Sequence, residues 1–229
     1  MTRTIGILLY ENAQPIDIIG PWEVFSLWKT ILHAPIDLYL IAETEELVRL
    51  DGQITLKAHK DFAHVPPLDA LIVPGGRGRL QQVNNDNLIS FIQQRGAHCK
   101  YVLSICTGMF LLAKAGLLNH KTVTTYWRAL PELKEDRHLK VVERRIVKSG
   151  NIWTSGGITC GIDLALAFIE EIAGTSVAGQ VQLLLEYFPE EKMYCSMDTV
   201  DQLPPYSSAH GPMKAPLPAY IRERLQMHI

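Results

Sequence analysis

Short apolar runs alternate along the chain with longer segments in which apolar residues recur at helical spacing. The runs typical of strands buried on both faces lie at 4–9, 36–42, 69–73, 101–105 and 122–125. The segments typical of helices lie at 16–28, 86–96, 107–115, 126–136, 162–173 and 177–187. Two stretches, 47–57 and 141–154, have the turn residues of hairpins. Because buried strands alternate with helices, the pattern predicts a three-layer α/β/α sandwich with a mostly parallel sheet.

The periodicity ends near residue 188. Six prolines fall between Phe188 and Pro218, and few apolar positions there are regularly spaced. This composition favours an extended segment that lies on the protein surface or on a partner subunit. We therefore divide the chain into an α/β domain at 1–187 and a proline-rich C-terminal extension at 188–229.

Composition and charge exclude several classes of function. The 229 residues are 47% hydrophobic and 20% charged, with a net charge of -2, as in an ordinary globular protein. No cluster of Lys and Arg predicts a nucleic-acid surface, and no apolar run approaches the ~18 residues that span a membrane. The first residues indicate a strand rather than a signal peptide, and the four cysteines form no CxxC pair, so we expect a cytoplasmic protein with reduced thiols.

The most informative stretch is 101–118, YVLSICTGMFLLAKAGLL. Small residues, Ser104 and Gly108, flank Cys106 at two positions on either side, which is the pattern of a nucleophile elbow with cysteine as the nucleophile. A thiol at the start of a helix is expected to be more acidic than a free cysteine, and the Thr107 N–H would face developing negative charge. The alternative is that Cys106 is an ordinary buried cysteine.

Asp17 and the turn Pro74-Gly75-Gly76 are the other candidates. Asp17 lies among isoleucines, where burial would raise its pKa and allow it to exchange a proton with a substrate at Cys106. The alternative is a helix N-cap. The glycine turn lacks the GxGxxG spacing of a dinucleotide site, but it lets backbone N–H groups approach a ligand.

The histidines give no candidate base or metal site. None of the eight occupies an obvious position beside Cys106, and the residue after the cysteine is Thr107. His59 and His64 lack the spacing of metal ligands, so we expect no metal ion.

These motifs resemble the ThiJ/PfpI superfamily, which has a class I glutamine-amidotransferase-like, flavodoxin-like fold, and within it the isonitrile (isocyanide) hydratase branch. The resemblance covers about residues 4–198. Its signatures are DIIGP at 17–21, PGG at 74–76, SICTGMFLLAKAGLL at 104–118, TTYW at 124–127, SGGITCGIDLAL at 155–166 and VQLLLEY at 181–187. Asp17, in place of the superfamily's usual glutamate, and Thr107 after the cysteine narrow the match to this branch.

The resemblance implies a lyase that hydrates an isonitrile to an N-substituted formamide. Cys106 would attack the isonitrile carbon to give a thioimidate, and Asp17 would carry protons and activate water. It also implies polar support from Thr107 and the Gly76 backbone, and a pocket formed by Gly75, Ile19, Tyr126 and Ile158. It implies a small-molecule substrate, no cofactor and a homodimer. Tyr126 replaces the histidine of the family's TTHW motif, so substrate choice is expected to differ.

Two alternatives stay open at this point. The first is another cysteine-hydrolase or glyoxalase-like activity of the same superfamily. The second is a non-catalytic thiol or stress sensor related to the N-terminal domain of AraC-type regulators. Only the proline-rich segment and a short helix follow the domain here, so direct DNA binding is not expected.

Overall fold

A seven-stranded sheet forms the centre of the protein. The structure is a computed structural model that describes residues 2–189 and 194–226. The strand order is β10-β11-β7-β6-β1-β2-β5. Their bounds are β1 (Arg3–Leu8), β2 (Ile36–Ala42), β5 (Lys60–Asp61), β6 (Ala70–Val73), β7 (Tyr101–Ser104), β10 (Ile146–Ser149) and β11 (Ile152–Ser155).

All neighbouring pairs in this sheet are parallel except β10 with β11, which are antiparallel at one edge. Gly6 in β1 pairs with Leu71 in β6 on one side and with Tyr39 in β2 on the other. Strands in this position are covered on both faces, which explains why their sequences are nearly continuous apolar runs. The predicted mostly parallel sheet is confirmed.

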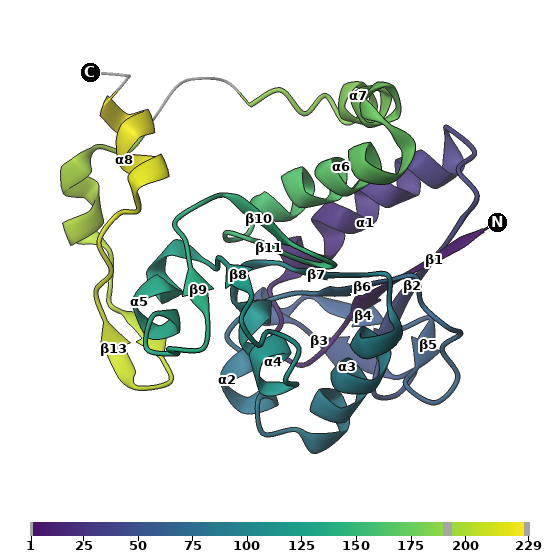
Figure 1. The fold of residues 1–229 in the computed structure, drawn as a ribbon, viewed down its shortest axis with the longest axis horizontal. Coiled ribbons are helices and arrows are strands. Elements are labelled where there is room, and N and C mark those ends of the chain that lie inside the picture. The colour runs from purple at the N-terminus through teal and green to yellow at the C-terminus, as the bar shows by residue number, and fades with distance from the viewer. Residues whose placement is uncertain (1, 190–193, 227–229) are drawn as a thin grey trace.

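Helices cover both faces of the sheet (Figure 1). Helices α1 (Pro15–Thr30) and α6 (Cys160–Ala173) lie on one face, and α7 (Thr175–Leu184) lies outside them. Helices α2 (Arg79–Gln82), α3 (Asp86–His98) and α4 (Met109–Lys114) lie on the other. The predicted three-layer sandwich is confirmed.

Helix α1 runs without a break through Gly20 and Pro21, although a proline inside a helix removes a backbone hydrogen bond and commonly ends or kinks the helix. The reason is close packing against α6. A Cβ on Gly20 would lie 3.1 Å from Ile162 Cγ1, and a Cβ on Gly161 would lie 3.3 Å from Pro21 Cγ. Burial of this contact outweighs the one backbone hydrogen bond that the proline removes.

Smaller elements complete the fold. The predicted hairpin at 47–57 is present as β3 (Leu47–Arg49) and β4 (Thr55–Lys57), and β8 (Thr122–Val123) pairs with β9 (Lys140–Val141). The helix expected at 126–136 is only a 3₁₀ turn (Trp127–Ala129) followed by α5 (Leu130–Leu133).

The C-terminal segment has more regular structure than its composition predicted. It contains a 3₁₀ turn (Met197–Gln202), an antiparallel hairpin of β12 (Tyr206–Ser208) and β13 (Gly211–Met213), and α8 (Ala219–Gln226). The division at residue 187 stays a prediction, and 190–193 and 227–229, which belong to the predicted extension, lie outside the described residues.

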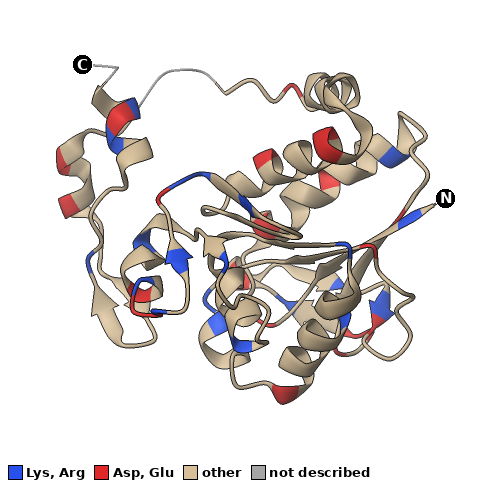
Figure 2. Cartoon of the chain, in the orientation of Figure 1, with Lys and Arg blue, Asp and Glu red and all other residues tan. Residues whose placement is uncertain are grey.

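Charged residues of both signs are spread over helices, strands and loops (Figure 2). Within the described part of the chain, no helix is both long and apolar enough to cross a bilayer.

The turn after β7 packs closely on the end of β6. It is a 3₁₀ turn, Cys106–Gly108, that leads into α4. A Cβ at Gly108 would lie 2.3 Å from the Val73 carbonyl oxygen and 2.5 Å from that of Pro74. A small residue is therefore required at this position, as the elbow pattern predicted.

We expect Gly108→Ala to lower the free energy of unfolding by about 1–3 kcal/mol, because the methyl group forces the turn away from β6. Urea unfolding monitored by circular dichroism measures this. The matched control is Gly179→Ala in α7, where an added Cβ has no atom within 4 Å and the better helix propensity should stabilise by up to ~1 kcal/mol. Equal unfolding midpoints for Gly108→Ala and wild type would contradict the close packing.

Candidate active site

All the predicted site residues except Tyr126, which comes after β8, follow four strands whose carboxyl ends lie at one edge of the sheet. Asp17 lies in the first turn of α1, after β1, and Gly75 follows β6. Cys106 follows β7, and Ile158 lies in the loop after β11. This edge is where open parallel sheets bind ligands.

Cys106 occupies a strained position at the elbow. Its φ is 55°, in the left-handed region that residues with a Cβ rarely adopt. Two hydrogen bonds hold the conformation. The Cys106 N–H donates to the Gly156 carbonyl at 3.0 Å, and the Thr125 hydroxyl donates to the Cys106 carbonyl at 2.7 Å. The nucleophile elbow predicted from the sequence is therefore present.

The glycine turn lies directly against the elbow. A Cβ on Gly75 would be 2.9 Å from Cys106 Cβ and 2.5 Å from the Thr107 nitrogen, so only glycine fits. The Gly76 N–H donates to Thr107 Oγ1 at 3.1 Å. Gly76 therefore orients Thr107, and this donor is already engaged rather than free for a substrate.

Asp17 is fully buried and does not cap its own helix. The N-cap of α1 is Gln14, without a side-chain cap, so the alternative interpretation of Asp17 is wrong. Instead, the Gly75 N–H donates to Asp17 Oδ2 at 2.9 Å. Among the described residues Oδ1 has no hydrogen-bond partner of regular geometry, but the Cys106 thiol interacts with the carboxyl and lowers its pKa.

Burial dominates the electrostatics of this pair. Loss of water raises the pKa of Asp17 to about 8, against the opposing effects of the Gly75 N–H and the Cys106 thiol. Burial, and then the charge of Asp17, raise the pKa of Cys106 well above its usual value, against the N–H groups of Thr107 and Ile158. The prediction that the Cys106 thiol is more acidic than a free cysteine is therefore wrong. Helix α4 begins only at Met109, and the buried carboxyl outweighs the amides.

The arrangement can nevertheless transfer protons. A thiol and a carboxyl that share a water-poor site, with the carboxyl pKa near neutrality, can pass a proton between them. The Thr107 and Ile158 N–H groups that interact with the sulfur can also stabilise negative charge that develops beside it. The sequence predicted Ile158 as a pocket residue but not the contact of its N–H with the sulfur, because the direction of this N–H depends on a φ of 52° in the loop.

A cavity of about 400 Å³ opens above Cys106. Its lining includes five of the residues predicted from the sequence: Cys106, Thr107, Gly76, Tyr126 and Ile158. Asp17 and Gly75 are buried beneath this surface. Ile19 does not line the cavity, since two residues along a helix from Asp17 is ~200° around its axis.

The rest of the cavity wall comes from residues that sequence patterns did not identify. Arg79 and Arg128 line the cavity, together with Pro204, Pro205 and Tyr206 of the C-terminal segment. The Tyr126 and Tyr206 rings meet edge to face with centroids 5.7 Å apart. No local pattern could have signalled this contact between residues 80 positions apart.

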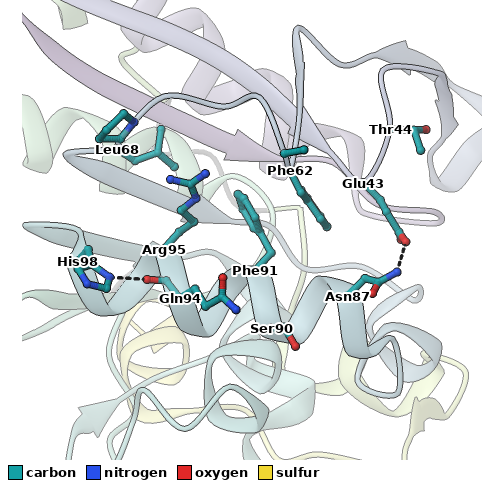
Figure 3. A pocket seen from close by; sticks show the side chains of 12 residues that line it. Glu43, Thr44, Phe62, Leu68, Asn87, Ser90, Phe91, Gln94, Arg95 and His98 are labelled. Atoms are coloured by element: carbon teal, nitrogen blue, oxygen red, sulfur yellow. Dashed lines mark hydrogen bonds between the residues drawn. The ribbon is translucent and has the colours of Figure 1, made fainter.

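A second hollow, of about 960 Å³, lies between α3 and the neighbouring loops (Figure 3). Phe62 stacks on Phe91 there, and Asn87 donates to Glu43. None of the predicted site residues lines it. Among the described residues, no group of three His, Cys, Asp or Glu side chains could hold a metal ion.

A cysteine elbow opposed by a buried carboxyl, on a mostly parallel sheet between two helical layers, defines a class of cysteine-elbow α/β proteins. Comparison with known families is consistent with this class. The DJ-1/PfpI family model matches residues 3–171. The chain belongs to the DJ-1/PfpI family.

Its relatives include both an enzyme and a regulator. The chain is 36% identical over 189 residues to isonitrile hydratase of Pseudomonas putida, covering 82% of this chain and 80% of the relative. It is 27% identical to the HTH-type transcriptional regulator GbdR of Pseudomonas aeruginosa, covering 81% of this chain but 51% of the regulator. A crystal structure of a ThiJ/PfpI family protein from Pseudomonas syringae superposes with a TM-score of 0.79 at 26% identity, covering 97% of this chain and 84% of that one.

The raised pKa of Asp17 predicts how stability depends on pH. The folded protein binds this proton more tightly than the unfolded chain, so the Asp17 contribution to stability falls as pH rises from the unfolded pKa of 3.8 toward about 8. Asp17→Asn keeps an acceptor for Gly75 but cannot ionise. We expect the melting temperature of Asp17→Asn, relative to wild type, to be higher at pH 8 than at pH 5, as measured by calorimetry.

Asp69→Asn is the matched control. The Asp69 carboxyl binds Lys100, which holds the Asp69 pKa below the usual value. In wild type this carboxylate is therefore already ionised at pH 5 and contributes its full stabilisation there. The melting-temperature difference between Asp69→Asn and wild type should be similar at pH 5 and pH 8. A pH-independent difference for Asp17→Asn would contradict the raised pKa.

Proposed function

We propose that the protein is a cysteine-dependent hydratase that adds water to an isonitrile and releases an N-substituted formamide. The main support is the buried Asp17 carboxyl, which is held by the Gly75 N–H and interacts with the Cys106 thiol. The similarity to isonitrile hydratase of Pseudomonas putida points in the same direction.

In the first step, the Cys106 sulfur bonds to the terminal isonitrile carbon while its proton passes to Asp17. Asp17 then delivers that proton to the same carbon. The thiol S–H bond breaks, and one S–C and one C–H bond form, which gives a thioimidate. Because Asp17 lies beside the sulfur, a single group carries the proton throughout.

In the second step, water adds to the thioimidate carbon and loses a proton to Asp17. The N–H groups of Thr107 and Ile158 face the region where negative charge develops. Asp17 passes this proton to the thioimidate nitrogen. The C–S bond then breaks as the new hydroxyl becomes the formamide carbonyl, and the hydroxyl proton returns to the Cys106 sulfur through Asp17. The formamide carries the oxygen of the water, and the enzyme returns to its starting state.

The sensor alternative has less support. A thiol that senses oxidants needs thiolate character and exposure, whereas Cys106 is 6% exposed and burial raises its pKa. The similarity to GbdR extends over about half of that regulator. Assays with methylglyoxal and with a peptide test the glyoxalase-like and hydrolase alternatives. An assay with p-nitrophenyl isocyanide tests the hydratase proposal.

We also propose that the protein acts as a cytoplasmic homodimer on a small molecule. Leu183 and Leu184 of α7 are 66% and 44% exposed, and Val181 is the only residue of this helix that is buried. An apolar helix face of this kind favours covering by a second copy of the chain.

We expect Cys106→Ala and Asp17→Asn each to lower kcat for p-nitrophenyl isocyanide by at least about 100-fold, since each removes a group that forms or breaks a bond. Formamide release measured by liquid chromatography tests this. The control is Cys160→Ala, which removes a buried thiol that does not line the cavity. Turnover of methylglyoxal or the peptide but not of the isocyanide would overturn the hydratase proposal.

The pH profile is a separate prediction. Asp17 must be ionised to accept the thiol proton, so kcat/KM should rise with pH, reach half of its maximum near pH 8, where the carboxyl titrates, and level off only above that pH. Tyr10 lies near the pair, but its hydroxyl donates to the Pro74 carbonyl at 2.7 Å and its pKa is raised well above 10. A flat profile between pH 6 and 9 would exclude Asp17 as the base.

A further inference from the structure

Three arginines line the cavity above Cys106, and two of them are neutralised. Arg77 Nε lies 3.8 Å from Asp51 Oδ2. The buried Arg79 donates to both oxygens of Glu132, at 2.6 and 2.5 Å. Arg128 has no carboxylate partner within the described part of the chain. The cavity wall therefore carries one uncompensated positive charge.

The Arg128 guanidinium is held in place by aromatic rings. It lies 5.9 Å from the Trp127 ring centroid and 5.7 Å from that of Tyr206. One of its N–H groups donates to the Pro204 carbonyl. The guanidinium also interacts with the Tyr126 hydroxyl. It has five N–H donors, so these two contacts leave others for a ligand.

Tyr126 connects this cation with the nucleophile. Its ring contacts Trp127 and Tyr206, whose centroids lie 6.0 and 5.7 Å away. Burial raises the pKa of its hydroxyl, the Arg128 guanidinium lowers it, and the Cys106 charge raises it, so this hydroxyl lies within the influence of both groups. A molecule that reaches Cys106 can thus also reach Arg128 within the same cavity of about 400 Å³.

We propose that Arg128 binds a carboxylate of the substrate, so that the preferred substrate is a small isonitrile that carries a carboxylate. The identity of the reacting group rests on the proposed function, whereas the anion subsite rests on the cavity alone. The planar guanidinium binds a carboxylate through two parallel N–H bonds. The Tyr126 hydroxyl is a second group that can donate a hydrogen bond to this carboxylate.

The test compares 4-isocyanobenzoate with its neutral methyl ester. The quantity measured is the ratio of kcat/KM for the acid to kcat/KM for the ester. We expect Arg128→Gln to lower this ratio by about tenfold or more, mainly through KM for the acid. Arg128→Lys should keep part of the preference, and added salt should reduce it.

The ratio separates charge recognition from a structural effect. If Arg128→Gln only displaced the segment around Pro204, both substrates would suffer alike and the ratio would not change. Arg77→Gln is the matched control, because it removes a charge from the same cavity that Asp51 already neutralises. An unchanged ratio in Arg128→Gln, or an equal loss in Arg77→Gln, would overturn the proposal.

If neither isonitrile is hydrated, the proposed function is refuted. A second assay then tests the Arg128 anion subsite without any hydratase activity. Iodoacetate and iodoacetamide both alkylate thiolates, and only the first is an anion. We expect Arg128→Gln to lower the iodoacetate-to-iodoacetamide rate ratio at Cys106 by about tenfold, as measured by peptide mass spectrometry. The exposed Cys195 is the internal reference, with an unchanged ratio. Equal ratios at Cys106 in variant and wild type would refute the subsite.

Discussion

The site depends on one glycine, Gly75, which joins three segments at once. Its N–H binds the Asp17 carboxylate at 2.9 Å and so connects the end of β6 with α1. Its missing Cβ lets the elbow approach until only a hydrogen atom fits between Gly75 and the Thr107 nitrogen. Any side chain at this position would separate the carboxyl from the sulfur and open the pair to water.

Closure of this contact determines the chemistry of the pair. Water at the carboxyl would return the Asp17 pKa toward its usual range, and it would also lower that of Cys106. The burial that makes the sulfur less acidic therefore also makes the carboxyl a base near neutrality. Burial of a polar group costs free energy, and under the proposed function this cost is offset because the burial places the proton carrier beside the nucleophile.

Local patterns predicted the elements that depend on local physics. Buried strands, the elbow with Ser104 and Gly108, and the unusual position of Asp17 are all visible in short stretches of sequence. The acidity of Cys106 was mispredicted because it depends on how deeply distant segments bury it. The wall that contains Tyr206 was missed for the same reason, since a proline-rich stretch gives no periodicity that indicates where it packs.

The elbow alone does not separate the functions found among relatives, which include an isonitrile hydratase and a transcriptional regulator. The separation must come from groups around the sulfur. A sensor would benefit from an exposed, acidic thiol, whereas a hydratase benefits from a buried carboxyl that exchanges protons with the thiol and with water. Cys106 is 6% exposed and Asp17 is fully buried. The environment of these two side chains therefore favours the proposed hydration over redox sensing.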